Sequence, residues 1–184
     1  MRHFILFSRQ GFTSSNFKNL RDSGRLDLVS HCIISSFFLS HKTRKDVTLH
    51  IILNGPPNPP LYIKIEGSKL YDTRTDEETI GIILKNVLSN NKHPGFEISK
   101  KSFQELIKEL SEENEIYVLE EKGELIENIR LKDNVAFVLG DQVGLPKKEE
   151  LFALRYGKKI SLGKTVYLAA DCITILNYNL DKVL

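Results

Sequence analysis

The stretch Phe137-Val138-Leu139-Gly140-Asp141-Gln142-Val143-Gly144-Leu145-Pro146 decides the fold class of this 184-residue chain. The apolar run over 135–139 predicts a buried strand, and the glycine-bearing turn after it marks the strand's end. Similar apolar runs occur at 4–7, 47–53 and 116–119, and segments with helical spacing lie between them. Strands that alternate with helices indicate an α/β fold, with a mainly parallel sheet flanked by helices.

Patterns outside these runs complete the expected architecture. Apolar residues at helical spacing predict helices at 26–41, 100–111, 148–156 and 166–180. Thr75-Asp76-Glu77-Glu78 has the form of a capping box, which predicts the start of a further helix. Short strands are expected at 61–65 and 159–161, and a stiff loop at 54–60, where four prolines in five positions exclude a helix. No long linker interrupts the chain, so we expect a single domain over 1–184.

Composition excludes several classes of protein. Lys and Arg number 26 against 24 Asp and Glu, so the net charge of +2 is too small for a polycation that binds nucleic acid by bulk charge. The two cysteines, Cys32 and Cys172, are too few for a disulfide framework, and no spacing resembles a zinc site. No apolar run reaches the length of a membrane span or of a signal-peptide core. We therefore expect a cytoplasmic protein with no metal and no membrane contact.

Glycine follows three of the predicted strands, at 119–123, 139–144 and 161–163. The missing Cβ lets main-chain groups approach a flat ligand such as an adenine ring, and open parallel sheets bind ligands at this edge. The alternative is that each glycine only turns the chain. A P-loop and a dinucleotide fingerprint are both absent from the sequence, so a nucleotide polyphosphate is not expected.

Several motifs then occur in a recognisable order. They are Asp46-Val47-Thr48-Leu49-His50, Asn54-Gly55-Pro56-Pro57-Asn58-Pro59-Pro60, the 137–146 stretch, Ile160-Ser161-Leu162-Gly163, and Cys172-Ile173 with Asn177 and Leu180-Asp181. In these motifs the whole chain resembles the archaeal tRNA pseudouridine-54 N1-methyltransferase family, TrmY, of the SPOUT superfamily. The resemblance implies S-adenosylmethionine as methyl donor, N1 of pseudouridine 54 in the tRNA T-loop as acceptor, a C-terminal trefoil knot and a homodimer.

By the same resemblance, the knot and the donor site occupy about 115–184. The residues expected to bind the donor are Leu119, Gly140, Ser161, Leu162, Gly163, Leu168 and Cys172. Cys172 is expected to line the pocket and not to act as a nucleophile, because a free cysteine at a helix start is usually a small buried apolar residue. The chain departs from the family pattern at Asp171, where His is expected.

Arg25, Asp27 and His31 form the leading polar group for the acceptor side. Asp27 and His31 are four residues apart and so share a helix face. A similar arrangement occurs in related ribosomal RNA pseudouridine methyltransferases, which implies that Arg25 contacts a phosphate or a uracil carbonyl and that Asp27 orients or deprotonates the base. Alternatively, Asp27 is an ordinary first-turn acid that the helix dipole favours.

Other polar residues have weaker claims. Arg44 and Lys45, in the basic run 42–45, are expected either to meet tRNA phosphates or to form a solvated turn. His50, inside a strand, is expected to be a satisfied core or interface histidine. Two alternatives remain for the function: a related methyltransferase that acts on ribosomal RNA, and a non-catalytic RNA-binding assembly factor.

Overall fold

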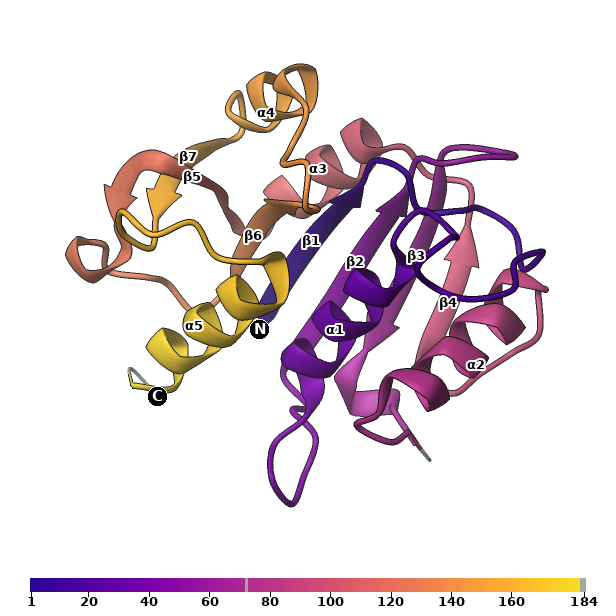
Figure 1. Ribbon diagram of the computed structural model, residues 1–184. Helices are drawn as coiled ribbons and strands as arrows, with labels where there is room; N and C mark the ends of the chain where they lie inside the picture. The colour runs from indigo at the N-terminus through magenta and orange to yellow at the C-terminus, as the bar shows by residue number, and fades with distance from the viewer. Residues whose placement is uncertain (72, 183–184) are drawn as a thin grey trace.

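The computed structural model describes residues 1–71 and 73–182, which form a seven-stranded sheet with helices on both faces (Figure 1). The strand order is β4-β3-β2-β1-β6-β5-β7. The strands are β1 (Arg2–Ser8), β2 (Val47–Leu53), β3 (Leu61–Glu66), β4 (Phe96–Ser99), β5 (Glu115–Leu125), β6 (Val135–Gly140) and β7 (Gly157–Ser161).

Parallel pairing dominates the sheet, as predicted. β1 lies parallel to β2 and β6, and β5 lies parallel to β6 and β7. The antiparallel pairings, at one edge, are β2 with β3 and β3 with β4, so among the described strands β3 alone runs against the others. The sequence pattern does not predict β4, because this four-residue edge strand has one buried side chain, Phe96, and so carries little apolar pattern.

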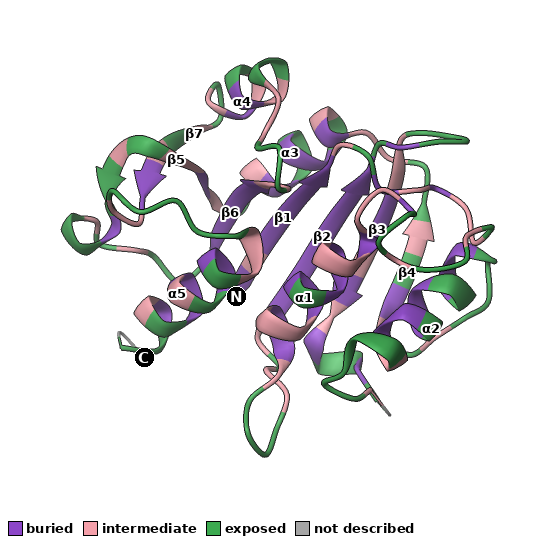
Figure 2. Ribbon diagram, in the orientation of Figure 1, coloured by how far each residue is buried: buried purple, intermediate pink, exposed green. Residues whose placement is uncertain are grey.

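Helices cover the two faces unequally. The α-helices are α1 (Leu26–Phe37), α2 (Glu77–Leu88), α3 (Phe103–Ser111), α4 (Lys147–Ala153) and α5 (Ala169–Asp181), and short 3₁₀ helices occupy Gly67–Lys69 and Ile126–Asn128. One core cluster packs α1, α2 and α5 on the sheet, and the other packs α3 and α4 on the opposite face. The central strands are therefore buried on both sides, whereas the outward surfaces of the helices are exposed (Figure 2).

Two helix boundaries differ from the predicted ones for local reasons. The helix predicted over 26–41 ends at Phe37, because Phe38 turns extended, with ψ 136°, and pairs with Thr43. The capping box predicted at Thr75 is wrong. Asp76 is the N-cap of α2, and its carboxylate accepts a hydrogen bond from the Thr79 amide at 2.7 Å.

Further differences concern the ends of other elements. The helix predicted from residue 100 begins later, at Phe103, behind a capping box formed by Ser102 and Glu105. The helix expected from 166 begins at Ala169, since Leu168 is extended and serves as the N-cap. β5 runs on to Leu125, well past the predicted end at 119, and the helix predicted over 148–156 is the shorter α4. Within the described residues, no helix is long and apolar enough to cross a membrane.

Ion pairs attach the end of α5 to the amino ends of β1 and β2. The buried guanidinium of Arg2 lies 2.7 Å from Asp181 and 2.8 Å from Asp46. Arg44 pairs with the same Asp181 carboxylate at 2.6 Å. These cations hold the pKa of Asp181 below its usual range, Arg44 having the larger effect. The last helix is thereby held against the centre of the sheet, although β7, which precedes it, lies at the edge.

A buried polar chain lies on the face covered by α3. Nδ1 of His3 is 2.9 Å from Nε2 of His50, whose Nδ1 is 2.7 Å from the Tyr62 hydroxyl. His50 is 3% exposed, as expected for a core histidine. Burial is the main cause that lowers the pKa of His3 to about 4 and the pKa of His50 well below its ordinary value, and nearby Lys64 adds to both.

This arrangement predicts acid sensitivity. Unfolding restores ordinary histidine pKa values, so the unfolded chain binds more protons than the folded chain between about pH 4 and pH 6.5. The free energy of unfolding should therefore fall as the pH is lowered through this range. Urea unfolding at pH 7 and pH 5 should show a smaller fall for His3→Asn than for the parent. The exposed loop variant His41→Asn serves as control, and an equal fall in His3→Asn and the parent would contradict the prediction.

Candidate active site

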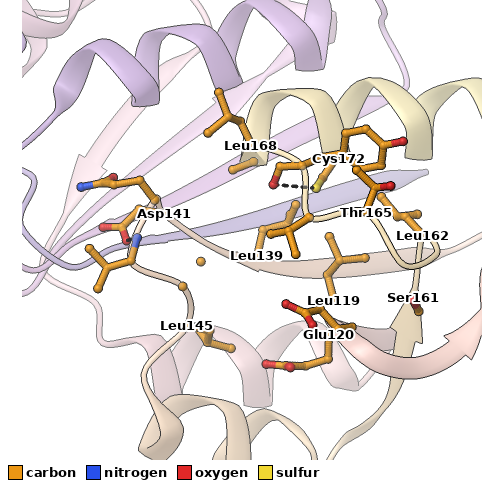
Figure 3. Close-up of a pocket in the computed structure, with 18 of the residues that line it drawn as sticks. Leu119, Glu120, Leu139, Asp141, Leu145, Ser161, Leu162, Thr165, Leu168 and Cys172 are labelled. Atoms are coloured by element: carbon orange, nitrogen blue, oxygen red, sulfur yellow. Dashed lines mark hydrogen bonds between the residues drawn. The ribbon is translucent and has the colours of Figure 1, made fainter.

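A cleft of about 460 Å³ opens where β6 and β7 end, beside the irregularity that follows Leu119 in β5, and the chain leads from there into α5 (Figure 3). Loop 140–145 forms one wall, and residues 161–169 with Cys172 form the opposite wall. In Figure 3, Asp141 and Leu145 lie on one side of the cleft, and Ser161 and Leu162 lie on the other. Two of the three glycine-bearing turns predicted from the sequence, 139–144 and 161–163, thus meet at one place. The third prediction is wrong, because β5 continues past residue 119 and Gly123 packs against the backbone of Ile160 outside the cleft.

All seven residues predicted to bind the donor line this cleft: Leu119, Gly140, Ser161, Leu162, Gly163, Leu168 and Cys172. The cleft also contains residues that the sequence motifs do not single out, among them Glu120, Asp141 and Leu145. Their signal was present, since Glu120 follows Leu119 and Asp141 follows Gly140 directly. Neither acid was expected at the site, because an acidic residue just after an apolar run in the sequence is ordinarily part of a solvated turn.

Close main-chain packing shapes the wall at Gly140. A Cβ atom at this position would lie 2.1 Å from the Leu145 amide nitrogen and 2.3 Å from the Gly144 carbonyl carbon. The Asp141 carboxylate organises the same loop, because it accepts hydrogen bonds from the amides of Val143 at 2.9 Å and Arg9 at 2.7 Å. Only glycine at 140 allows loop 141–145 to fold back so closely.

The chemistry of the lining fits a flat, partly cationic ligand. Leu119, Leu139, Leu162 and Leu168 offer apolar contact to a ring. The lining includes the carboxylates of Glu120, Glu121 and Asp141, whereas none of the described lining residues is Lys or Arg. Such a site disfavours a polyphosphate and favours a ligand with hydroxyls and a positive charge.

Cys172 lines the cleft as a small apolar side chain and does not serve as a nucleophile. Its Sγ lies 3.7 Å from the Tyr167 carbonyl oxygen, a contact drawn as a dashed line in Figure 3. Burial, with a smaller contribution from Asp171, raises the pKa of this thiol to about 11. The thiol is therefore protonated near neutral pH and weakly reactive.

Arg25 and Asp27 form a tight pair at the start of α1. Asp27 Oδ2 lies 2.9 Å from one terminal nitrogen of Arg25, and Oδ1 lies 3.0 Å from Nε. Arg25 is the N-cap of the helix and has a left-handed backbone, with φ 65°. The hydrogen bonds from Arg25 hold the pKa of Asp27 below its usual range. Asp27 is thus a weak base that fixes the direction of the guanidinium.

Arg25 lies beside the cleft, because it lines a small space between α1 and α5 together with Asp141 and Leu168. His31 shares the helix face with Asp27 but forms a different contact. Its Nε2 lies 2.9 Å from a Glu77 carboxylate oxygen on α2. The structure therefore brings Arg25 and Asp27 together and directs His31 elsewhere.

Arg44 and Lys45 lie far from the cleft. They precede β2, whose amino end pairs with the amino end of β1, whereas the cleft lies at the carboxyl ends of the strands. Arg44 is held by Asp181, and Lys45 donates to the Leu70 carbonyl at 3.4 Å. Both residues have structural partners, and neither lines the cleft.

Within the described residues, no group of three or more His, Cys, Asp and Glu side chains is placed so that it could hold a metal ion. The fold and the site define an α/β protein with a seven-stranded sheet and a cleft at its carboxyl edge, whose described lining includes carboxylates and neither Lys nor Arg. Residues 1–183 match the family described as "Putative SAM-dependent RNA methyltransferase".

Relatives define the family more closely. The chain is 38% identical to the tRNA (pseudouridine(54)-N(1))-methyltransferase of Methanocaldococcus jannaschii, over 99% of this chain and 97% of the relative. It is 36% identical to the enzyme of the same name from Thermococcus kodakarensis, over 98% and 99% of the two chains. The chain therefore belongs to the family of tRNA (pseudouridine(54)-N(1))-methyltransferases.

Solved structures share the fold at low sequence identity. Archaeoglobus fulgidus Nep1 bound to S-adenosylhomocysteine matches with a TM-score of 0.63 and 14% identity, over 91% of this chain and 75% of that chain. The SpoU methyltransferase AviRb of Streptomyces viridochromogenes, in complex with the cofactor AdoMet, matches with a TM-score of 0.51 and 12% identity, over 95% and 55% of the chains. These likenesses bear on the fold alone.

The packing at Gly140 predicts a binding defect. Gly140→Ala should displace loop 141–145 and weaken the affinity for S-adenosylhomocysteine at least about 10-fold, because a methyl group cannot share the space of the Leu145 amide. Calorimetric titration measures the affinity. Gly95→Ala is a matched control: Gly95 also has a constrained backbone, with φ +84°, but does not line the cleft. Equal affinities in the two variants would contradict the role of this close approach.

Proposed function

We propose that this protein transfers a methyl group from S-adenosylmethionine to N1 of pseudouridine 54 in the T-loop of tRNA. The observation that carries the proposal is the cleft at the carboxyl ends of β6 and β7 and the irregularity of β5, which has carboxylates and no described cation. Family membership supports the reaction and its substrate, since the full-length relatives carry this activity in their names.

The donor fits the lining described above. Main-chain groups of Leu162, Gly163 and Leu168 would hold the adenine ring between apolar side chains, and Ser161 and Cys172 would close the wall behind it. Glu120 and Asp141 supply negative charge beside hydroxyl groups and a positive sulfur. When bound, S-adenosylmethionine supplies an electrophilic methyl group, so the protein mainly has to align donor and acceptor.

Arg25 and Asp27 would serve the acceptor side. Arg25 uses Nε and one terminal nitrogen to hold Asp27, which leaves the other terminal nitrogen to donate to a uracil carbonyl or a phosphate. Asp27 acts through Arg25 and is a positioning residue. Its lowered pKa makes it a poor acceptor for the N1 proton, so the proton leaves to water or to another carboxylate.

The proposal extends to assembly. Residues 1–184 would form one domain, in which the chain returns from the edge strand β7 to α5 at the sheet centre and passes through a C-terminal trefoil knot. A homodimer would cover the apolar side chains of Val166 and Leu168, which are 72% and 55% exposed beside the cleft. Such an enzyme would act where tRNA is processed, in the cytoplasm.

Acceptor identity is tested with tRNA transcripts that carry either uridine or pseudouridine at position 54. With a donor labelled on its methyl group, only the pseudouridine transcript should acquire label, because the corresponding ring position of uridine is its glycosidic nitrogen. Mass spectrometry of the nucleosides identifies the product. Equal labelling of both transcripts would exclude N1 of pseudouridine as the acceptor. Label only on a pseudouridine-containing ribosomal RNA fragment would assign the activity to that RNA.

The role of Asp27 predicts a specific kinetic pattern. Asp27→Asn should lower kcat/KM for tRNA about 10- to 100-fold, because Arg25 loses its bidentate partner. The pH profile of kcat should keep its shape, since no proton passes through this residue. Glu78→Gln, which removes a first-turn acid of α2, is the control and should keep parental kinetics. Loss of one limb of the pH profile in Asp27→Asn would make Asp27 the proton acceptor instead.

A further inference from the structure

A second cleft, of about 520 Å³, lies at the carboxyl ends of β1 and β2. Arg9, Arg21 and Arg25 line it, together with the ring of Phe12. Among the described residues that line it, Asp22 is the one carboxylate, and it accepts a hydrogen bond from the side-chain Nδ2 of Asn19 at 2.7 Å. We call this site the arginine cleft. The cleft proposed for the methyl donor, lined by Glu120, Glu121 and Asp141, is called the donor cleft. The positive charge of the arginine cleft contrasts with these carboxylates.

Two of these guanidinium groups have no acidic partner. Within the residues that the structure describes, neither Arg9 nor Arg21 forms an ion pair with a carboxylate. Nε of Arg9 is buried and has no hydrogen-bond partner in that part of the chain. A buried donor without an acceptor costs free energy, and the guanidinium group that carries it has no described carboxylate to balance its charge.

The wall of the arginine cleft is held by main-chain hydrogen bonds between two loops. The Gly55 amide donates to the Gly11 carbonyl at 2.9 Å, and the Thr13 amide donates to the Pro56 carbonyl at 2.8 Å. Gly24 has a φ of +71°, and a Cβ there would lie 1.7 Å from the Gln10 carbonyl oxygen. The cleft is thus formed before any ligand arrives, which reduces the entropy cost of binding.

The arginine cleft adjoins the donor cleft at Asp141. Asp141 lines the donor cleft, and its carboxylate accepts a hydrogen bond from the main-chain amide of Arg9 at 2.7 Å. Arg25 lines the arginine cleft and also the small space that it shares with Asp141 and Leu168. A strand that presents one nucleoside to the donor cleft would therefore run its neighbouring nucleotides across the arginine cleft.

We propose that the arginine cleft binds the single-stranded RNA segment next to the methylated nucleotide. Arg9 and Arg21 hold its phosphate, and the half-buried ring of Phe12 stacks on a base. Guanidinium groups pair with phosphate oxygens, and unstacked loop bases stack on aromatic rings. The assignment rests on the proposed function, because the donor cleft defines which nucleotide is the neighbour.

The test uses the double variant Arg9→Gln/Arg21→Gln and a fluorescent T-arm stem-loop RNA. The RNA affinity should fall at least about 10-fold, and the slope of log K against log salt should be less negative by about 1 to 2. The affinity for S-adenosylhomocysteine should stay at the parental value. Arg21→Gln alone, at an exposed position, should show part of the same loss if the double variant folds poorly.

Controls separate a local contact from bulk charge. Lys92→Gln/Arg130→Gln removes two exposed cations that line neither cleft and should keep the parental RNA affinity. Phe12→Trp should retain binding, whereas Phe12→Leu should weaken it. Parental RNA affinity and salt slope in Arg9→Gln/Arg21→Gln would overturn the proposal, as would a loss equal to that in the control pair. If the parent methylates tRNA while these variants are unaffected, only the arginine cleft is refuted; if the parent methylates no RNA, the proposed function fails.

Discussion

Parallel pairing of β1 with both β2 and β6 is the constraint on which both clefts depend. The register places Ser8 opposite Leu53 and Phe7 opposite Gly140, so the residues that follow these strands emerge at one edge of the sheet. Arg9 and Asp141 become neighbours there, although 132 residues separate them in the chain. Polar residues that would be unremarkable on separate loops thereby form two adjoining sites of opposite charge.

The opposite charges of the two clefts suit the two reactants of the proposed methyl transfer, a cationic donor and an anionic RNA strand. Carboxylates line the site for a cationic donor. Three guanidinium groups line the site proposed for an anionic strand, and two of them, Arg9 and Arg21, form no ion pair within the described part of the chain. Asp141 lies between the two clefts. Its carboxylate accepts one hydrogen bond from the main-chain amide of Arg9 and one from that of Val143. The ion pair of Arg25 with Asp27 lies at the same junction, so the acceptor side is rigid where alignment matters most.

Sequence patterns predicted which residues meet in the cleft better than they predicted the side-chain partners of the residues proposed for the acceptor. The local pattern of an apolar run closed by glycine predicts both the strand and the open backbone, as at Leu139 and Gly140. Acceptor residues depend on side-chain partners. Asp27 and His31 share a helix face, yet Arg25 holds Asp27 and Glu77 holds His31. The basic run that contains Arg44 is typical of a phosphate contact. In the structure, however, Arg44 pairs with Asp181, which is far away in the sequence.

By itself, the sequence determined the alternating α/β order, the buried central strands, the glycine turns and the family. These features depend on local periodicity and on motifs of a few residues. Only the tertiary structure decided which charges are paired, which are free, and which strand ends meet. The physical reason is that groups within a few ångströms decide whether the charge of a side chain is balanced or left available to a ligand. These groups come from parts of the chain that no local pattern connects.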